Sequence, residues 1–470
     1  MATPAITQPR RRYWSSLLEA IRGTHQDFTE GSISRAIFLL ATPMVLEMFM
    51  ESLFAIVDVF WVTRLGANAI ATVGLTESMM TLVFSVAFGV SLSTTAMVAR
   101  RIGEKDSQGA ATAAVQAILL GIGVSILIGV PGFLLAPRLL GWMGAPADLI
   151  ATGRHYAAIA FGSSTVVMLL FLNNAIFRGA GDASVAMRVL WTSNLINLAL
   201  DPCFIFGLGP FPALGVTGAA VSTLTGRSCG VFYQMWVLTR GHSRVVIRRQ
   251  DWRVAPRVIA SLARVSATGV LQFIVAHISW IALVRMISSF GSVAVAGYTI
   301  GIRIFAFVLL PAWGLSGAAA TMVGQNLGAG KPARAERAVW LTAFYNMTFL
   351  GFIGLALIAV PEPIARLFTS DPLVGSYAVD CLRIVGYGNL TYAFGMVMLQ
   401  AFNGAGDTVT PTVINTIGFL FCEIPLAWAL AFPLHMKVRG VFASIPIAET
   451  LIALMGLFLF TRGSWKKRLI

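Results

Sequence analysis

The chain has 470 residues, of which 57% are hydrophobic and only 11% are charged. Soluble globular domains carry about 25% charged residues, so this composition excludes an ordinary soluble protein and predicts a polytopic membrane protein. The net charge of +14 does not indicate a nucleic-acid partner, because most lysines and arginines fall in alternate loops once the apolar segments are drawn.

The chain opens with a leader, residues 1–34, in which Arg10, Arg11 and Arg12 are followed by no long apolar core. We therefore expect a cytoplasmic leader and not a cleaved signal peptide. Twelve apolar segments follow that are long enough to cross a bilayer as helices. They predict an all-α integral membrane fold with helices at 35–63, 69–99, 110–135, 149–177, 186–207, 215–239, 258–287, 294–325, 336–360, 374–402, 411–433 and 440–461.

The first apolar segment contains three carboxylates, Glu47, Glu51 and Asp58. Their spacings of four and seven residues place them within about 40° of one another on one helix face. A charge at the middle of a spanning helix costs roughly 2.5 to 3.5 kcal/mol when it faces lipid. We therefore expect all three to face a bundle interior or a water-filled cavity, where they could exchange protons.

Further polar side chains lie in the fourth and fifth apolar segments. Asn174 is the asparagine of the fourth segment that we expect to face inward, although a purely structural hydrogen bond is an equal alternative. Asn197 and Asp201, four residues apart, share a face of the fifth segment. Pro202 removes one backbone N–H beside them and is expected to kink that helix.

The second half of the chain repeats the first with a shift of 225 residues. The shift superposes glycines on glycines, among them Gly66 on Gly291, Gly89 on Gly314 and Gly103 on Gly328. Six segments per half give the copies the same orientation, so the pseudo-two-fold axis between them lies along the membrane normal. We predict an N-lobe (35–239), a cytoplasmic linker (240–257), a C-lobe (258–461) and a basic cytoplasmic tail (462–470), with the substrate cavity between the lobes.

The same shift superposes two GAGD sequences, at Gly179–Asp182 and Gly404–Asp407. Glycine permits a tight backbone bend and aspartate can cap the next helix. We interpret both as turns at cytoplasmic helix ends.

The C-lobe has polar residues of its own, and we list its candidates here: Gln272, His277, Gln325, Asn389, Glu423 and Glu449. Leu283 stands where the shift would place a partner for Asp58. The sequence therefore assigns most of the acid chemistry to the N-lobe.

The distribution of positive charge predicts the topology. One set of loops holds only five lysines and arginines, namely Arg64, Arg138, Arg366, Lys437 and Arg439. Loops rich in Lys and Arg stay in the cytoplasm, so both termini are expected there, in a multi-pass membrane protein.

Several stretches together resemble the multidrug and toxic compound extrusion (MATE) transporters, and most closely their DinF-like bacterial branch. They are TEGSISRAIFLLATPMVLEM, VDVFWVTRLGANAIATVGL, FRGAGD, NLALDP and LGVTGAAVST, and the likeness covers almost the whole chain beyond Thr29. The resemblance implies two six-helix lobes around a central cavity, and export of cationic, amphipathic small molecules driven by entry of protons or sodium.

The resemblance also implies roles for single residues. It makes Asp58 the ion-coupling carboxylate and gives it a polar network of Asn174, Asn197 and Asp201. Some relatives have a neutral polar residue a turn or two before that aspartate, where this chain has Glu51 and Glu47. The sodium-coupled branch is marked by acids in the seventh and tenth helices, where this chain has Gln272, His277, Asn389 and Tyr392. This favours protons as the coupling ion, with sodium as the alternative. The side chains expected to contact substrate are Glu47, Glu51, Phe54, Gln272 and His277.

Two other functions stay open at this point. A flippase of lipid-linked oligosaccharides would need several cavity arginines for a pyrophosphate. A membrane enzyme would need a nucleophile with a base or a metal cluster, and the sequence has no HExxH or other metal spacing and no GxxxxGK[ST] loop. We therefore expect a transporter without cofactor or metal, which contacts membrane lipid and works as a monomer.

Overall fold

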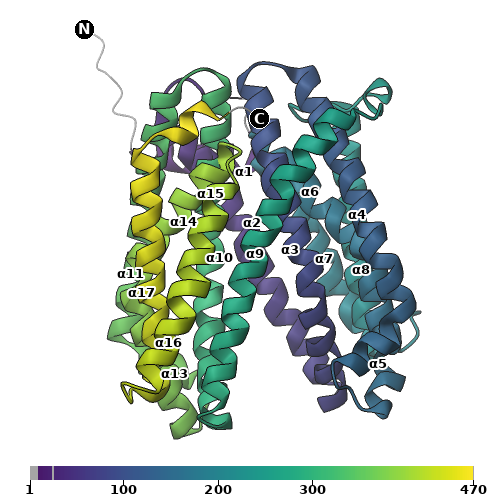
Figure 1. The fold of residues 1–470 in the computed structure, drawn as a ribbon. Helices are drawn as coiled ribbons and strands as arrows, with labels where there is room; N and C mark the ends of the chain where they lie inside the picture. The colour runs from purple at the N-terminus through teal and green to yellow at the C-terminus, as the bar shows by residue number, and fades with distance from the viewer. Residues whose placement is uncertain (1–8, 24–25, 469–470) are drawn as a thin grey trace.

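The computed structural model describes residues 9–23 and 26–468; residues 1–8, 24–25 and 469–470 of the predicted leader and tail lie outside them. The described chain folds into long helices that run back and forth along one axis (Figure 1). In the first half they are α1 (Pro9–Arg22), α2 (Ile33–Thr63), α3 (Ala67–Gly103), α4 (Ser107–Trp142), α5 (Ala147–Gly162), α6 (Ser164–Ala180), α7 (Ala183–Phe206) and α8 (Val216–Arg240).

The linker contains the short helix η1 (Arg249–Asp251), and the second half follows it. Its helices are α9 (Pro256–Ser288), α10 (Ser292–Gly328), α11 (Pro332–Ala359), α12 (Pro361–Arg366), α13 (Pro372–Tyr387), α14 (Asn389–Gly404), α15 (Val409–Asn415), η2 (Thr416–Glu423), α16 (Ile424–Ala431), α17 (Lys437–Thr461) and η3 (Ser464–Lys467).

These helices supply the twelve predicted spans, so the predicted fold class is confirmed. By length and composition alone, nine of the described helical stretches are apolar enough to cross a membrane. α2, α8 and the pair α13–α14 complete the set. The fourth and tenth spans are each interrupted, at Ser163 and Gly388, which the sequence did not predict.

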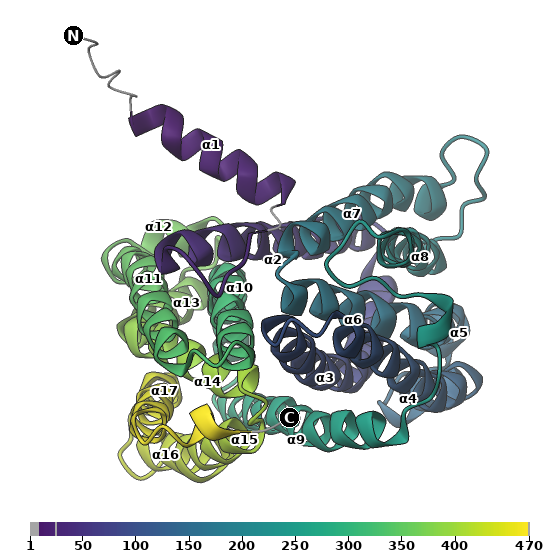
Figure 2. The ribbon, with the colours of Figure 1, turned by 90° about the horizontal axis from the view of Figure 1, so that it is seen from above.

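Seen along the helix axes, the spans form two groups, α3 to α8 and α10 to α17, and α2 and α9 run along opposite edges from one group to the other (Figure 2). Each group has its own apolar core. The N-lobe core is built around Ile118, Leu172 and Phe177. The C-lobe has two such clusters, one around Tyr298 and Phe442 and the other around Phe402 and Phe460.

The lobes meet through two glycine contacts that obey the 225-residue shift. A Cβ on Gly89 of α3 would lie 2.5 Å from the backbone nitrogen of Val270 in α9, and a Cβ on Gly314 of α10 would lie 2.5 Å from the carbonyl oxygen of Met44 in α2. The first helix of each lobe thus packs on the second helix of the other lobe. Such close approach is possible only without a side chain at the crossing.

A second glycine pair lies nearer the helix ends. Gly103 of α3 packs on the backbone of Gln325 in α10, and Gly328 of α10 packs on the backbone of Arg100 in α3. The carbonyls of Arg178 and Gly179 in the N-lobe accept hydrogen bonds from Thr321 (3.0 Å) and Gln325 (2.9 Å) of α10. The lobes are therefore closed against each other at the end that carries α1 and η3.

The end of the leader takes part in this closure. Phe28 is buried, and its ring lies against the position of Gly181 in the N-lobe. Arg334 of α11 in the C-lobe donates to the carbonyl oxygens of Phe28, Glu30 and Gly31. The segment before α2 is thus bound to both lobes.

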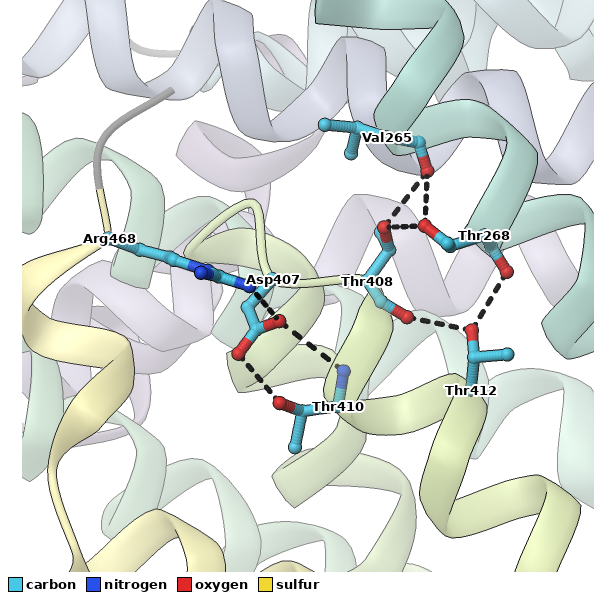
Figure 3. Close-up of polar contacts among 7 residues, drawn as sticks. All are labelled: Val265, Thr268, Asp407, Thr408, Thr410, Thr412 and Arg468. Atoms are coloured by element: carbon cyan, nitrogen blue, oxygen red, sulfur yellow. Dashed lines mark hydrogen bonds and ion pairs between the residues drawn. The ribbon is translucent and has the colours of Figure 1, made fainter.

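The two GAGD sequences are turns, as predicted, but only the second aspartate caps a helix. Asp182 accepts from Ser243 Oγ (2.6 Å) and from the backbone nitrogen of Arg244 (2.7 Å), so it anchors the segment that follows α8. Asp407 accepts from the backbone nitrogen of Thr410 in α15 and pairs with Arg468 of the tail at 3.1 Å (Figure 3).

Threonines next to Asp407 fasten α15 to α9. Thr412 Oγ1 donates to the Thr268 carbonyl (2.8 Å) and Thr408 Oγ1 donates to the Val265 carbonyl (2.9 Å) (Figure 3). Beyond α15 the same span meets α9 again, where Ser279 hydrogen-bonds Glu423 at the end of η2. α15, η2 and α16 therefore run alongside α9 in one register, and η2 is a π-helical segment that ends at Glu423.

The glycine crossings predict a steric test. Gly89→Val should cost about 1–3 kcal/mol of stability, because the new side chain has no room against Val270, and Gly314→Val should cost a similar amount by symmetry. Gly74→Val in α3 is the matched control, since its Cβ meets nothing within 4 Å. Thermal unfolding in detergent measures the difference. Equal melting temperatures for Gly89→Val and Gly74→Val would contradict the packing.

Candidate functional site

A cavity in two compartments lies between the lobes. The central compartment, of about 150 Å³, is lined by Glu47, Glu51, Asn174 and Arg178 of the N-lobe together with C-lobe residues. The C-lobe compartment, of about 410 Å³, is lined among others by Gln272, His277, Asn415 and Glu449. Phe273 and Trp313 line both compartments.

Phe273 and Trp313, which line both compartments, stack with Phe88 of the central compartment to form an aromatic wall. The ring of Phe88 stacks on Phe273 (centroids 5.2 Å apart) and on Trp313 (5.7 Å), and Phe273 stacks on Trp313 (5.8 Å). Phe88 comes from the N-lobe and the other two from the C-lobe. The wall therefore belongs to both lobes and would change if they moved apart.

The central compartment is built around Glu47. Its carboxylate is buried, accepts from Asn174 Nδ2 (3.1 Å) and forms an ion pair with Arg178 (3.1 Å). Gln234 of α8 donates to the Asn174 oxygen at 2.8 Å, which fixes the orientation of the amide. A charge buried in this way is stable only with a partner, so Arg178 is the group that permits Glu47 to ionise here.

Parallel packing of α2 and α7 sets the positions of the other N-lobe acids. Glu51 accepts from Asn194 (3.2 Å), and the shift of 143 residues between them is also the shift from Asp58 to Asp201. Seven residues are about two turns on both helices. Asp58 and Asp201 therefore lie on facing stretches of α2 and α7 about two turns further along, within electrostatic range of each other.

Asp201 is buried, whereas Asp58 is only half-buried. Ser222 of α8 donates to one oxygen of Asp201, and the other oxygen has no hydrogen-bond partner within the described part of the chain. Asn197, one turn before, donates to Thr223 at 3.0 Å. A bare carboxylate oxygen in such a place is costly unless it carries a proton or meets a ligand.

The predicted four-residue network is therefore divided. Asp58 and Asp201 come together, and Asn197 lies one turn from them. Asn174 instead bonds Glu47, which is eleven residues before Asp58 on α2, or about 16 Å along a helix at 1.5 Å per residue. The expectation that Asn174 belongs to the polar network of Asp58 is thus corrected, because its helix crosses α2 near Glu47.

The other predicted substrate contacts also separate. Glu47 and Glu51 line the central compartment, and Gln272 and His277 line the C-lobe compartment. Phe54 is buried in α2 and is not among the described side chains that line either one.

Sequence reasoning missed three charged residues. Arg178 was quoted only within the FRGAGD stretch, without a role, yet it carries the ion pair to Glu47. Arg227 of α8 and Glu77 of α3 lie within electrostatic range of Asp58. Their positions in or directly beside predicted membrane-spanning segments could have identified them, because a charged side chain there needs a partner of opposite charge. The described residues contain no group of three or more His, Cys, Asp and Glu that could hold a metal ion.

Comparison with known proteins identifies the relatives of this arrangement. The MatE family model matches residues 43–203 and 270–429. The chain is 26% identical over 448 residues to the probable multidrug resistance protein NorM of Thermotoga maritima, covering 93% of this chain and 94% of that protein. It is 25% identical over 432 residues to the FAD transporter of Shewanella oneidensis, covering 92% and 95% respectively.

A solved structure has the same architecture. It is described as an outward-facing conformation of a multidrug resistance MATE family transporter of the MOP superfamily, with 25% identity and a TM-score of 0.87. The match covers 96% of this chain and 99% of that chain. The two-lobed fold is therefore shared over almost the whole length.

The Glu47–Arg178 pair predicts a specific pattern of stability. Arg178→Ala should cost about 3 kcal/mol, because it leaves a buried carboxylate without its counter-charge. Glu47→Gln added to Arg178→Ala should recover most of that loss. Arg35→Ala, which breaks an exposed pair with Glu19, is the control and should cost less than about 1 kcal/mol. Thermal unfolding of the purified variants measures all three; an equal loss in the single and double variants would refute the pairing.

Proposed function

The chain belongs to the MATE family of membrane transporters, and we propose that it is a secondary active exporter of cationic amphipathic compounds in exchange for protons. Family membership makes it a multi-pass transporter and not an enzyme. The relative from Thermotoga maritima is named a probable multidrug resistance protein, which supports multidrug efflux. The ion and the compounds are assigned from the site itself.

The observation that carries the proposal is the juxtaposition of Asp58 and Asp201. Asp58 is half-buried, and Asp201 is buried with one oxygen unpartnered by any described group. Two negative charges within electrostatic range of each other repel. A proton that arrives at Asp58 would therefore pass to Asp201 at little cost.

The transport cycle follows from this arrangement. Protonation of Asp58 and Asp201 from the outer side removes negative charge from the N-lobe. A bound cation is then no longer attracted by the N-lobe carboxylates and leaves. Pro202, next to Asp201, is the position at which α7 can bend during this step. Deprotonation towards the cytoplasm restores the site. The exchange works only if the inward and outward states differ in their affinity for protons and cargo.

Protons are preferred over sodium as the coupling ion. A sodium ion without its water is bound by several oxygen atoms in fixed positions. One carboxylate oxygen of Asp201 already accepts a hydrogen bond from the Ser222 hydroxyl, so this oxygen is less available to a sodium ion. The seventh and tenth spans carry Gln272, His277, Asn389 and Tyr392, not the acids of the sodium-coupled branch. Sodium is the alternative that the transport assay distinguishes.

The orientation in the membrane follows from charge. The ends with α1 and η3 lie on the side whose loops hold most of the lysines and arginines. We therefore place both termini in the cytoplasm of a bacterial inner-membrane protein. The closed side described above is then the cytoplasmic side. One chain contains both lobes and the cavity, so a monomer suffices.

A flippase of lipid-linked oligosaccharides receives less support. Such cargo would require several free arginines for its pyrophosphate. Among the described residues that line the two compartments, the arginine is Arg178, which is already paired with Glu47. The cavity is therefore better suited to a cation.

Transport in proteoliposomes tests the coupling. Asp58→Asn and Asp201→Asn should each lower uptake of a fluorescent cation driven by a proton gradient at least about tenfold, since they remove the group that exchanges the proton. Glu362→Gln, an exposed carboxylate paired with Arg383, is the matched control and should transport normally. A sodium gradient without a proton gradient should drive no uptake. Parental transport by either aspartate variant would reject the mechanism.

A further inference from the structure

The C-lobe compartment contains hydrogen-bond acceptors that no described group satisfies. Gln272 and Asn415 are 8% and 6% exposed, and the side-chain oxygen of each lacks a partner among the described residues. Both residues line the compartment. The side-chain oxygen of Asn403, which also lines the compartment, is likewise without a described partner. Buried polar atoms in native proteins are nearly always bonded, so these unsatisfied acceptors on one cavity indicate a missing donor.

The same compartment contains a buried acid without a counter-ion. Glu449 of α17 is 7% exposed and lines the compartment. No ion pair of Glu449 occurs within the described ranges, and its neighbour Glu423 is also acidic. In the central compartment, by contrast, Arg178 already neutralises Glu47. Glu51 also lines the central compartment without an ion pair among the described residues, but its carboxylate accepts a hydrogen bond from Asn194 at 3.2 Å. Within the C-lobe compartment, the place for a cation is beside Glu449.

Hydrogen bonds fix the helices that carry the two amides. Thr268 and Thr412 are bonded one turn before Gln272 and Asn415 on α9 and α15 (Figure 3). Beyond Asn415 the chain enters the π-helical segment η2, and such segments often occur at functional sites. The acceptors are thus held by two helices in a defined register and not by mobile loops.

The other side chains that line the compartment are suited to the aromatic part of an organic cation. Phe273, Trp313 and Tyr392 line the compartment, and aromatic faces attract cations. The Nδ1 of His277 hydrogen-bonds the Phe273 carbonyl at 2.8 Å, so in the neutral ring Nε2 is a further acceptor. About 410 Å³ lies within the usual size range of small-molecule pockets and far exceeds the need of a bare metal ion.

We propose that the C-lobe compartment is a second cargo site, which binds a protonated amine or amidine on an aromatic body. Glu449 supplies the negative charge opposite the bound cation, and the side-chain oxygens of Gln272 and Asn415 accept hydrogen bonds from the N–H groups of that cation. The aromatic wall of Phe273 and Trp313 separates this site from Glu47 and Glu51. The proposal rests on the proposed export of cations, but it concerns binding and needs no ion gradient.

Equilibrium binding of the fluorescent diamidine DAPI to the full chain in lipid nanodiscs tests the site. Glu449→Gln should weaken binding at least about tenfold, because it removes a charge-assisted hydrogen bond in a desolvated place. Gln272→Met, which keeps the length of the side chain, should weaken it about threefold. Glu423→Gln is the matched control: Glu423 is a buried acid of the same lobe, bonded to Ser279 and outside the lining, and its variant should stay within about twofold.

The possible outcomes distinguish a cargo site at Glu449 from a general effect of charge and from a site for alkali cations. Parental affinity in Glu449→Gln overturns the proposal, and so does an equal loss in Glu423→Gln, which would reflect the charge of the whole lobe. Displacement of the dye by sodium that disappears in Glu449→Gln would make this an alkali-cation site and also overturn it. Thermal unfolding shows whether each variant is folded. Dye binding at Glu449 without proton-driven transport would leave this site standing while the proposed antiport failed.

Discussion

The contact on which the rest of the molecule depends is the crossing of backbone on backbone at Gly89 and Gly314. Each glycine lets the first helix of one lobe lie directly on the second helix of the other. The two crossings are related by the internal repeat, so neither lobe can shift at one without a matching shift at the other. Opening the cavity at one end would therefore require the lobes to rock against each other about an axis that lies in the membrane plane, perpendicular to the pseudo-two-fold axis. The cavity, its aromatic wall and the cross-lobe hydrogen bonds of α6 and α10 all lie between the parts that would rock.

Chemistry differs between the lobes although their geometry is repeated. In the N-lobe, α7 runs alongside α2 and brings Asp201 to Asp58; in the C-lobe, the helices that follow Asp407 run alongside α9 and bring Glu423 to Ser279. The repeat thus preserves how helices pack and leaves the side chains on the shared faces free to diverge. This division is consistent with the proton exchange proposed for the N-lobe, while the C-lobe contributes a larger compartment with unsatisfied acceptors.

The sequence was sufficient for features that depend on the bilayer and on local geometry. Apolar length defined the spans, the glycine repeat predicted the symmetry, and the common face of Glu47, Glu51 and Asp58 predicted an inward orientation. It failed where the result depends on which helices cross and at what depth. Asn174 was assigned to Asp58 because both are inward and polar, but only the crossing of α6 over α2 places it at Glu47. The sequence also did not predict the π-helical segment η2 or the role proposed for Glu449, because neither produces a periodic pattern in the sequence.

The ion pair of Glu47 and Arg178 limits how cargo can use the central compartment. A cation that binds Glu47 must compete with the guanidinium of Arg178 on α6. The backbone carbonyl of Arg178 in turn accepts a hydrogen bond from Thr321 of the opposite lobe. While the lobes are closed at the end that carries α1 and η3, Arg178 is held close to Glu47 and the carboxylate is occupied. Separation of α6 from α10 would free Arg178 to withdraw. Access to Glu47 would then be coupled to the rocking of the lobes, so that this acid becomes accessible to a cation only when that end is open.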